Sequence, residues 1–425
     1  MEGRMKSNIA LEKVSIKTDR KELIWVKGKK EEFSVYRIPK QHLYFNIENG
    51  RYADKMIQLR ADNPGVDIDP KEEKWKKEIL SMLEGEYTTL EGAGTESDKV
   101  AFQRLRDDII NRTQLKPGVV LADGGVIDGN RRLAVFISLH EPQFSYFEGV
   151  ILPEDIPATD RWGIEVGIQM GKDQQLDYSA INKLLKIRQG LELFKSIQLP
   201  IGETPESMVV KSLYGVDKKE IESSIERINL IDEYLAFFKI LGQYHRVSAN
   251  SEQFIEAVNV LKAAEGKLKE HEKSKLKSQL FVIIRENLMS NWDIRDFSRA
   301  LGGRSKSPGR KSKPIEKAIN HFVEHSTDPT KIRDAYTENK SATLIEKTKT
   351  ICSEFQNIFE AEKQSNQPLI LVKDARIKME TLKESLKSFK KDEDEPMIKK
   401  ELIEIKKLVK ACHNTLHNVK KNKKK

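Results

Sequence analysis

The sequence predicts an α+β domain at the N-terminus followed by a mostly α-helical remainder, which ends in a C-terminal helical bundle or coiled-coil hairpin. Three observations support this fold class. Short runs rich in β-branched and aromatic residues lie early in the chain, as strands require. From Leu176 onward, apolar residues recur at three-four spacing, which is the period of a helix. Two apolar stripes of heptad type then occupy the C-terminal region.

These patterns divide the chain into four segments. Residues 20–155 form the predicted α+β domain, and residues 173–301 form a helical region. A basic linker covers 302–314, and a C-terminal helical bundle with an antiparallel hairpin and a lysine tail covers 315–425. A chain of 425 residues is long enough for several domains, so burial of a core is not limiting.

The composition excludes some classes of protein. The chain has 75 Lys and Arg residues against 66 Asp and Glu residues, a net charge of +9, which is compatible with nucleic acid but does not require it. Its only cysteines, Cys352 and Cys412, are far apart, which favours a reducing compartment. No apolar run approaches the length of a membrane span, and the N-terminus lacks a signal-peptide core. We therefore expect a cytoplasmic protein with no membrane partner.

The first elements are a hairpin and two helices. Runs of β-branched and aromatic residues at 23–26 and 33–38 predict two paired strands. Apolar periodicity predicts helices over Glu72–Met82 and Val100–Asn111. The segment 92–97 between these helices is rich in glycine, but it lacks the lysine and the strand-before-helix context of a P-loop, so we interpret it as a loop.

The most informative stretch follows a short apolar run at 118–122. A turn leads into a second short strand, and Asp128-Gly129 then opens a helix that begins with Asn130, Arg131 and Arg132. The amide groups and the positive dipole at a helix N-terminus attract anions. Arginine adds a fixed charge whose planar fork matches phosphate. The stretch therefore predicts a phosphate or nucleotide site, although a β-turn with an exposed arginine pair has the same pattern.

This stretch also resembles a known family. Leu115–Val120 followed by Gly125–Arg132 is similar to the signature of the ParB/sulfiredoxin-like superfamily, and the earlier Asn49-Gly50-Arg51 resembles its Asn-x-Arg segment. The resemblance covers roughly the first 240 residues. It implies that the chain binds CTP or ATP with Mg²⁺. The nucleotide-binding residues that it implies are Asp128, Gly129, Asn130, Arg131, Arg132 and Arg51. Asn130 replaces the glutamate of the family's hydrolytic members and the catalytic cysteine of sulfiredoxins, so we expect hydrolysis to be slow or absent.

A helix-turn-helix outline begins at Thr204-Pro205, where Thr is an N-cap and Pro opens a helix. Asp217 starts a second helix, and Glu220 completes a capping-box pattern. ParB proteins carry such a unit in the matching place, which implies duplex DNA as a partner. The candidate DNA-binding residues are Lys218, Lys219, Arg227, Arg304, Arg310 and Lys311. The carboxylates of Glu222 and Glu226 on the second helix argue against DNA reading there.

The C-terminal region carries two stripes at three-four spacing, separated by an acidic break at 391–396. The first stripe comprises Val372, Ala375, Met379, Leu382, Leu386 and Phe389, and the second comprises Ile398, Leu402, Ile405, Val409, Cys412, Leu416 and Val419. They predict an antiparallel helical hairpin with Cys412 in its core, covered by a third helix over Leu344–Phe359. We expect this hairpin to mediate a homodimer as well.

One metal pattern is set aside. His321-Phe322-Val323-Glu324-His325 matches the H-x-x-E-H pattern of inverted zinc peptidases, whose histidines share one face of a helix. The sequence names no third ligand, so a charged helix face is the favoured interpretation. The same holds for His413 and His417.

The leading hypothesis is a ParB-like, nucleotide-responsive DNA-binding protein. A rival is an enzyme of the same fold, either a nuclease or a nucleotide phosphohydrolase (a weak CTPase or ATPase) from a mobile element or an anti-phage system, with Asp107, Asp108 and Asp128 as metal ligands. A second rival is a non-catalytic protein–protein adaptor in which the arginine pair only stabilises a turn. Nucleotide binding and consumption by the purified protein discriminate between these hypotheses.

Overall fold

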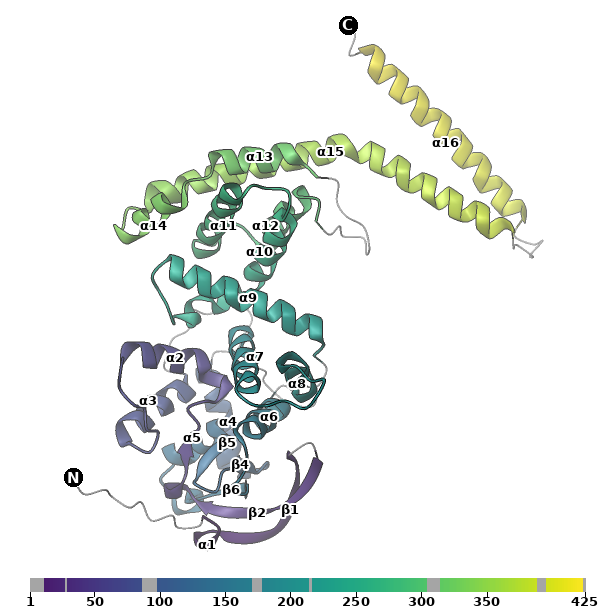
Figure 1. The fold of residues 1–425 in the computed structure, drawn as a ribbon. Coiled ribbons are helices and arrows are strands. Elements are labelled where there is room, and N and C mark those ends of the chain that lie inside the picture. The colour runs from purple at the N-terminus through teal and green to yellow at the C-terminus, as the bar shows by residue number, and fades with distance from the viewer. Residues whose placement is uncertain are drawn as a thin grey trace. The chain divides into compact units, whose positions relative to one another are not determined.

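A computed structural model describes residues 11–26, 29–85, 98–169, 178–213, 216–303, 314–387 and 395–422. The chain divides into two compact units, residues 1–359 and residues 360–425. The first unit contains an α+β part and most of the helices, and the second contains only helical segments (Figure 1). The predicted α+β domain followed by a mostly helical remainder is therefore confirmed.

The α+β part is built on a six-stranded mixed sheet. The strands are β1 (Ile16–Val26), β2 (Lys29–Pro39), β3 (Tyr44–Phe45), β4 (Gly118–Val120), β5 (Gly125–Asp128) and β6 (Tyr146–Ile151). Their order across the sheet is β1-β2-β6-β4-β5-β3. The β1–β2, β2–β6 and β4–β5 pairs are antiparallel, whereas β4–β6 and β3–β5 are parallel. The β1–β2 hairpin predicted from the sequence is confirmed.

Both faces of the sheet are covered. Successive strand residues point to opposite faces, so Val119 and Ile127 contribute to one core while Val120 and Val126 contribute to another. The first core includes Ile164 of α6 (Ala158–Gln169). The second is closed by helices that the sequence partly predicts. These are α2 (Ala53–Asp62), α3 (Glu73–Glu84), α4 (Asp98–Arg112) and α5 (Asn130–Ser138), preceded by the short α1 (Leu11–Val14).

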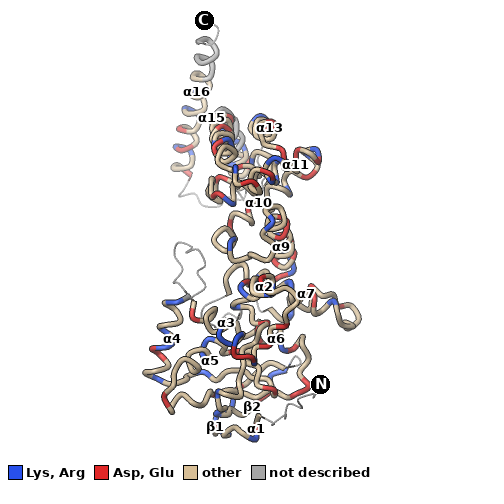
Figure 2. Tube along the Cα trace, turned by 90° about the vertical axis from the view of Figure 1, so that its left-hand side faces the viewer, with Lys and Arg blue, Asp and Glu red and all other residues tan. Residues whose placement is uncertain are grey.

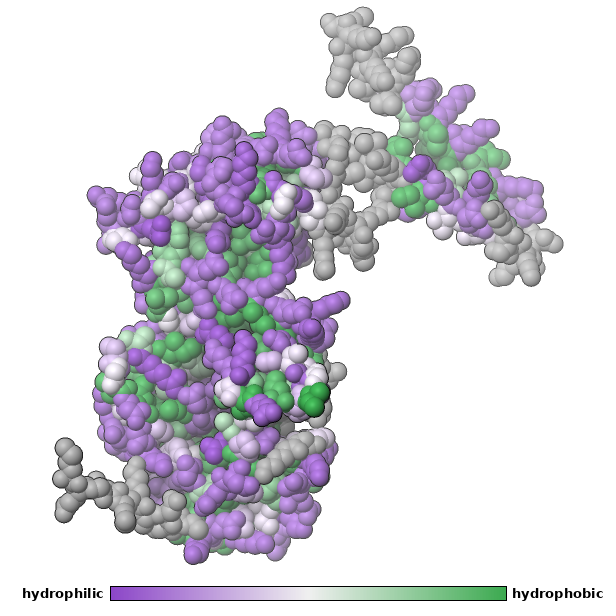
Figure 3. All heavy atoms as spheres, in the orientation of Figure 1, coloured by the Kyte–Doolittle hydropathy of each residue, from purple (hydrophilic) through white to green (hydrophobic). Residues whose placement is uncertain are grey.

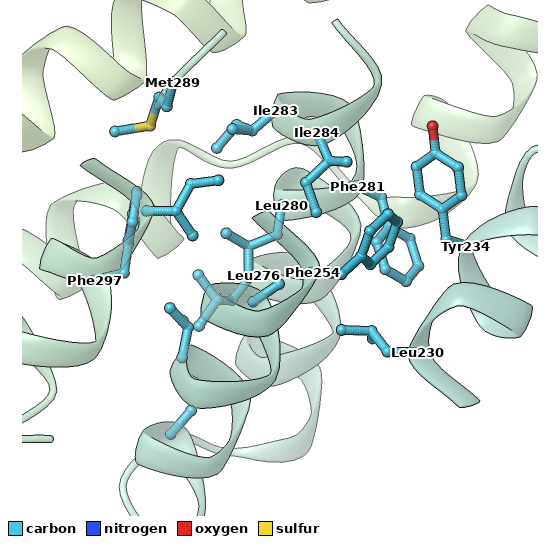
Figure 4. Packing of buried hydrophobic residues seen from close by; sticks show 14 of the residues in the cluster. Leu230, Tyr234, Phe254, Leu276, Leu280, Phe281, Ile283, Ile284, Met289 and Phe297 are labelled. Carbon is cyan, nitrogen blue, oxygen red and sulfur yellow. The ribbon is translucent and has the colours of Figure 1, made fainter. Parts of the chain in front are cut away.

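The remaining helices of the first unit pack around one large core and two smaller ones, which contain Val209 and Ile332. These helices are α7 (Ala180–Lys195), α8 (Pro205–Ser212), α9 (Lys218–Phe237), α10 (Ser251–Ala264), α11 (Glu270–Arg285), α12 (Asn291–Ala300), α13 (Glu316–His325), α14 (Pro329–Thr337) and the start of α15 (Ala342–Lys387). Figure 4 shows Tyr234 of α9 facing Phe254 and Phe281, and their ring centroids lie 5.3 and 5.5 Å from that of Tyr234. Phe297 stacks on Phe355 with 3.8 Å between ring centroids.

The stacking of Phe297 on Phe355 revises the predicted domain boundary. Ala318, Phe322 and Phe355 belong to the same core as the helices before residue 302. The segment 302–314 therefore does not separate two cores. The boundary between the two compact units falls inside α15, after Phe359. α15 also joins two helices that the sequence analysis treats separately, because it runs unbroken from the Leu344–Phe359 stretch into the first heptad stripe.

The second unit contains the end of α15 and α16 (Glu395–Asn422), and most of the predicted break between the two stripes, residues 391–394, lies outside the described residues. Apolar side chains gather on the described part of these helices in Figure 3. Met397, Leu408 and Val409 of α16 are all exposed, as is Val372 of α15. Cys412 is exposed too, so its predicted place in a core is wrong for the single chain. Hairpin packing of the two stripes stays a prediction.

None of the helices described here combines the length and apolar character needed to cross a membrane.

Candidate functional site

A cleft of about 750 Å³ opens beside the turn between β5 and α5. It brings together segments that are far apart in the sequence, namely β1, residues 49–51, α4 and its following loop, the β5–α5 turn, and the end of α6. Its polar and charged lining comprises Glu22, Asn49, Arg51, Asp108, Arg112, Thr113, Gln114, Lys116, Asp128, Asn130, Arg131, Arg132 and Gln169. All six nucleotide-binding residues expected from the sequence line this cleft, Gly129 included.

The cleft depends on a close approach of two glycines. Gly129 has φ +102° and serves as the N-cap of α5, a backbone conformation that side chains disfavour. A Cβ atom on Gly118 of β4 would lie 2.5 Å from the Phe147 ring and 2.8 Å from the Asp128 carbonyl oxygen. Because neither residue has a side chain, β4 and the start of α5 approach closely. This leaves the first turn of α5 at the edge of the cleft.

The Arg132 side chain binds other groups of the protein. Its guanidinium forms an ion pair with Asp128 at 2.7 Å, and the two side chains are 18% and 10% exposed. It also donates to the carbonyl oxygens of Lys116 and Pro117 in the segment leading into β4. We conclude that Arg132 fixes the approach to β4 and neutralises Asp128, in contrast to the phosphate contact expected from the sequence.

Asn130 also has a structural role. Its side chain is buried, and its Nδ2 donates to the Val126 carbonyl oxygen at 2.7 Å. Its Oδ1 accepts the backbone N–H of Asn46 at 3.0 Å. The amide therefore joins the start of α5 to the segment after β3. This use of both polar ends explains why an asparagine fits where the resembling family carries glutamate.

The remaining basic side chains give the cleft its positive character. Two of its acidic residues are paired, Asp128 with Arg132 and Asp108 with Arg112 at 3.0 Å. Arg51, Lys116 and Arg131 line the same space. Arg51 donates from Nη2 to the Gln169 side-chain oxygen at 2.6 Å, and that acceptor is neutral. The basic residues of the lining outnumber the acidic ones, so the cleft favours an anion.

The cleft is also lined by apolar side chains. They comprise Leu23, Ile24, Leu105, Ile109, Leu115, Val119, Val150 and Ile168. Leu23 and Leu115 are 61% and 59% exposed. Figure 2 shows basic and acidic residues interspersed along α4, whereas its Leu105 and Ile109 line the cleft. The cleft thus combines basic and apolar side chains.

A buried ion pair holds the segment that carries Arg51. Glu165 of α6 and Lys186 of α7 lie 2.7 Å apart, and their side chains are 3% and 2% exposed. Glu165 also accepts the backbone N–H of Gly50 at 2.7 Å and the Tyr178 hydroxyl at 2.8 Å. Burial and the neighbouring Glu165 carboxylate both raise the pKa of Tyr178 well above its usual value. The hydroxyl therefore remains a donor at neutral pH.

A second buried carboxyl lies beside this network. Burial raises the pKa of Asp54 at the start of α2, although the nearby Lys55 and a hydrogen bond with Asn182 oppose the shift. Its Oδ1 atom is buried without a hydrogen-bond partner. Asn182 of α7 accepts the Asp54 backbone N–H and donates to the Arg51 carbonyl oxygen at 2.9 Å. The backbone around Arg51 is thus tied to α7 from both sides.

Comparison with known proteins gives no family. The sequence matches no protein-family model and no curated protein. The resemblance to the ParB/sulfiredoxin-like superfamily therefore stays an expectation from the motifs alone.

The two helices of the helix-turn-helix outline are α8 and α9. Asp217 caps α9 by accepting the Glu220 N–H at 2.8 Å, as expected, and a full capping box forms instead at Thr204 and Ser207. Lys218 and Lys219 are exposed. Burial lowers the pKa of Arg227, and its Nε has no hydrogen-bond partner. The candidate DNA-binding residues Arg304, Arg310 and Lys311 lie outside the described residues.

The carboxylates and histidines considered as metal ligands are dispersed. Asp108 and Asp128 line the cleft but pair with arginines, and Asp107 accepts a hydrogen bond from Gln103. Within the described ranges, no group of three or more His, Cys, Asp or Glu residues has metal-binding geometry. His321 contacts Glu354 at 2.9 Å, and His325 contacts the His321 carbonyl oxygen, so these two rings are engaged along a helix face.

Sequence reasoning missed several residues of this site. Gln169 and Gln114 line the cleft, yet they belong to no motif, and Lys116 lies in the resembling stretch but was not predicted as a site residue. Gln114 donates to the carbonyl oxygens of Lys116 and Glu148 and accepts the Glu148 N–H, so it fixes the loop after α4. The only signal available for this loop was its position before the strand that leads to Asp128.

Proposed function

We propose that the cleft binds a nucleotide, with its phosphates at Arg51, Arg131 and the first turn of α5 and its base against the apolar side chains of the lining. The observation that carries this proposal is the combination of basic and apolar side chains in one cleft at a helix N-terminus. A nucleoside triphosphate, CTP or ATP with Mg²⁺, has this chemistry. Its polyanionic end needs fixed cations and amides, and its base needs an apolar surface.

Substitution of the cleft arginines tests this proposal. Each charge-assisted contact contributes about 1.5–3 kcal/mol, so Arg51→Ala and Arg131→Ala should each weaken binding roughly 10- to 150-fold. Arg60→Ala is the matched control, because Arg60 lies in the same part of the chain, pairs with Glu48 at 2.6 Å and does not line the cleft. Calorimetric titration with CTP and with ATP measures the affinities.

Two results would contradict this proposal. One is an absence of binding of either nucleotide by the folded wild-type protein. The other is an equal affinity in the Arg51, Arg131 and Arg60 variants, which would place the nucleotide elsewhere. Phosphate release in the same samples tests the rival enzyme hypothesis. We expect release to be slow, because Asp128 is already engaged by Arg132 and Gln169.

We propose duplex DNA as the second partner, contacted mainly by the C-terminal unit. Residues 360–425 contain 18 Lys and Arg residues against 11 Asp and Glu residues, so they carry +7 of the chain's net charge of +9. Lys399, Lys400, Lys406, Lys407 and Lys410 are exposed along α16, whereas α9 alternates Lys218 and Lys219 with acidic residues. Glu395 and Glu404 pair with Lys399 and Lys407 at 2.6 and 2.7 Å, so the surplus of lysines over carboxylates makes α16 the better surface for phosphates.

Salt dependence tests this second partner. If all five α16 lysines contact phosphates, replacing them by glutamine should reduce the slope of log affinity against log salt by about 4 to 5. Lys218→Gln with Lys219→Gln is the control and should leave the slope nearly unchanged. If the substitutions at Lys218 and Lys219 reduce the slope more than those on α16, the DNA contact lies on α9. No duplex binding at low salt would favour the protein–protein adaptor.

A further inference from the structure

Gln169 lies between two charged residues of the cleft. Its side-chain oxygen accepts a hydrogen bond from Arg51 Nη2 at 2.6 Å, and its Nε2 donates to Asp128. Both of these partners line the cleft, as does Gln169 itself. A single neutral amide thus joins the arginine to the carboxylate. One donor that Arg51 could offer to a phosphate is therefore used within the protein.

The contact is one that a phosphate can replace. Arginine binds a charged phosphate in a bidentate, charge-assisted manner, whereas a carboxamide oxygen offers one neutral acceptor. A phosphate at Arg51 would therefore displace the amide. Asp128 would keep its charged partner after this exchange, because Arg132 remains 2.7 Å away.

The surrounding structure limits the movement to one side chain. Gln169 is the last residue of α6, and Glu165, one turn earlier, is fixed by Lys186, Gly50 and Tyr178. A buried ion pair with these hydrogen bonds is costly to break, so the body of α6 stays in place. Within the last turn, Val166 is buried and Ile168 packs against a core, so the movement that releases Arg51 is a rotation of the Gln169 side chain.

We propose that Gln169 is a latch. Its side chain binds Arg51 in place of a phosphate and is displaced by the phosphate end of the ligand. This proposal rests on the proposed nucleotide site and names the residue that regulates it. The latch lowers the affinity for every phosphate ligand by the same factor, because it competes for Arg51 alone. It also links occupancy of the cleft to the conformation of the Gln169 side chain.

The test compares binding of CTP, ATP and inorganic pyrophosphate to the full-length wild-type protein, Gln169→Ala and Gln169→Leu. Loss of one competing hydrogen bond should tighten binding by about 5- to 10-fold in both variants, equally for the three probes. Gln103→Ala is the control, because Gln103 of α4 also donates to a carboxylate, Asp107 at 2.8 Å, but does not line the cleft. Circular dichroism establishes that each variant is folded.

The outcomes are distinct. If Gln169 contacts the ligand directly, both variants weaken binding, and if it is a bystander, affinity is unchanged. Either result overturns the latch, even when Arg51→Ala and Arg131→Ala show that the site itself is correct. No binding by the wild type or by either variant would overturn the proposed function and the latch together.

Discussion

Lys186→Met should be among the most destabilising single substitutions in the first unit. Lys186 donates to Glu165 at 2.7 Å and to the Glu48 carbonyl oxygen at 2.8 Å, and its side chain is 2% exposed. Methionine fills a similar volume but leaves the Glu165 carboxylate buried without its counter-charge. Breaking a buried pair in this way costs about 3–5 kcal/mol.

The double variant Glu165→Gln with Lys186→Met separates this charge effect from lost packing. Glutamine keeps an oxygen that accepts the Gly50 N–H and the Tyr178 hydroxyl, and no uncompensated charge remains. We therefore expect the double variant to be more stable than Lys186→Met alone. The difference between the double variant and the sum of the single variants measures the coupling.

Urea unfolding, followed by circular dichroism, measures these free energies. Lys21→Met is the matched control, since Lys21 and Glu32 lie 2.6 Å apart but are 59% and 55% exposed. Such a surface pair contributes about 0–1 kcal/mol. If Lys186→Met costs no more than Lys21→Met, the buried pair is not a major anchor of the cleft, and the argument that keeps the body of α6 in place is wrong.

Three further predictions follow from the same structure. Arg132→Ala should lower the free energy of unfolding by about 1–3 kcal/mol, because it leaves Asp128 without its counter-charge; a variant as stable as the wild type would instead return Arg132 to ligand binding. Asp54→Asn should stabilise the protein more at pH 8 than at pH 4, as measured by urea unfolding at each pH. The reason is that burial raises the folded-state pKa of Asp54, so the native state binds more protons than the unfolded state and loses stability as pH rises from the ordinary aspartate range. Removing residues 366–425 should convert a dimer into a monomer in light scattering, because the exposed apolar residues of α16 are then absent; two monomers would refute the dimer.

The fold was predictable where the sequence has a clear period. The β1–β2 hairpin, α3, α4, α8, α9 and the helices from α10 to α12 have apolar spacing or caps that identify them. α2 and α6 were missed. In α6 the buried residues Trp162, Glu165 and Val166 include a charged one, so its apolar stripe is interrupted. The sequence alone cannot show that Lys186 compensates Glu165.

The site was predictable only in part, and for a related reason. The β5–α5 turn is local, so its glycine and arginines lie next to one another in the sequence. The engagement of Arg132 is not local, because its partners, the carbonyl oxygens of residues 116 and 117, lie on another segment. In the same way, Cys412 lies on an apolar stripe, but exposure depends on what covers that stripe. Apolar periodicity identifies the buried face of a helix, whereas the partners of each side chain depend on tertiary contacts.

The origin of the cleft walls also has a consequence for synthesis. Its lining spans Glu22 to Gln169, and the ion pair that anchors the Arg51 segment needs Lys186. At about 5–20 residues per second, a ribosome needs roughly 10–40 s to reach that lysine. Until then the nascent sheet has the glycine turn and both of its arginines but no closed wall beside them. The cleft can therefore be completed only after the first residues of the following helical region have left the ribosome.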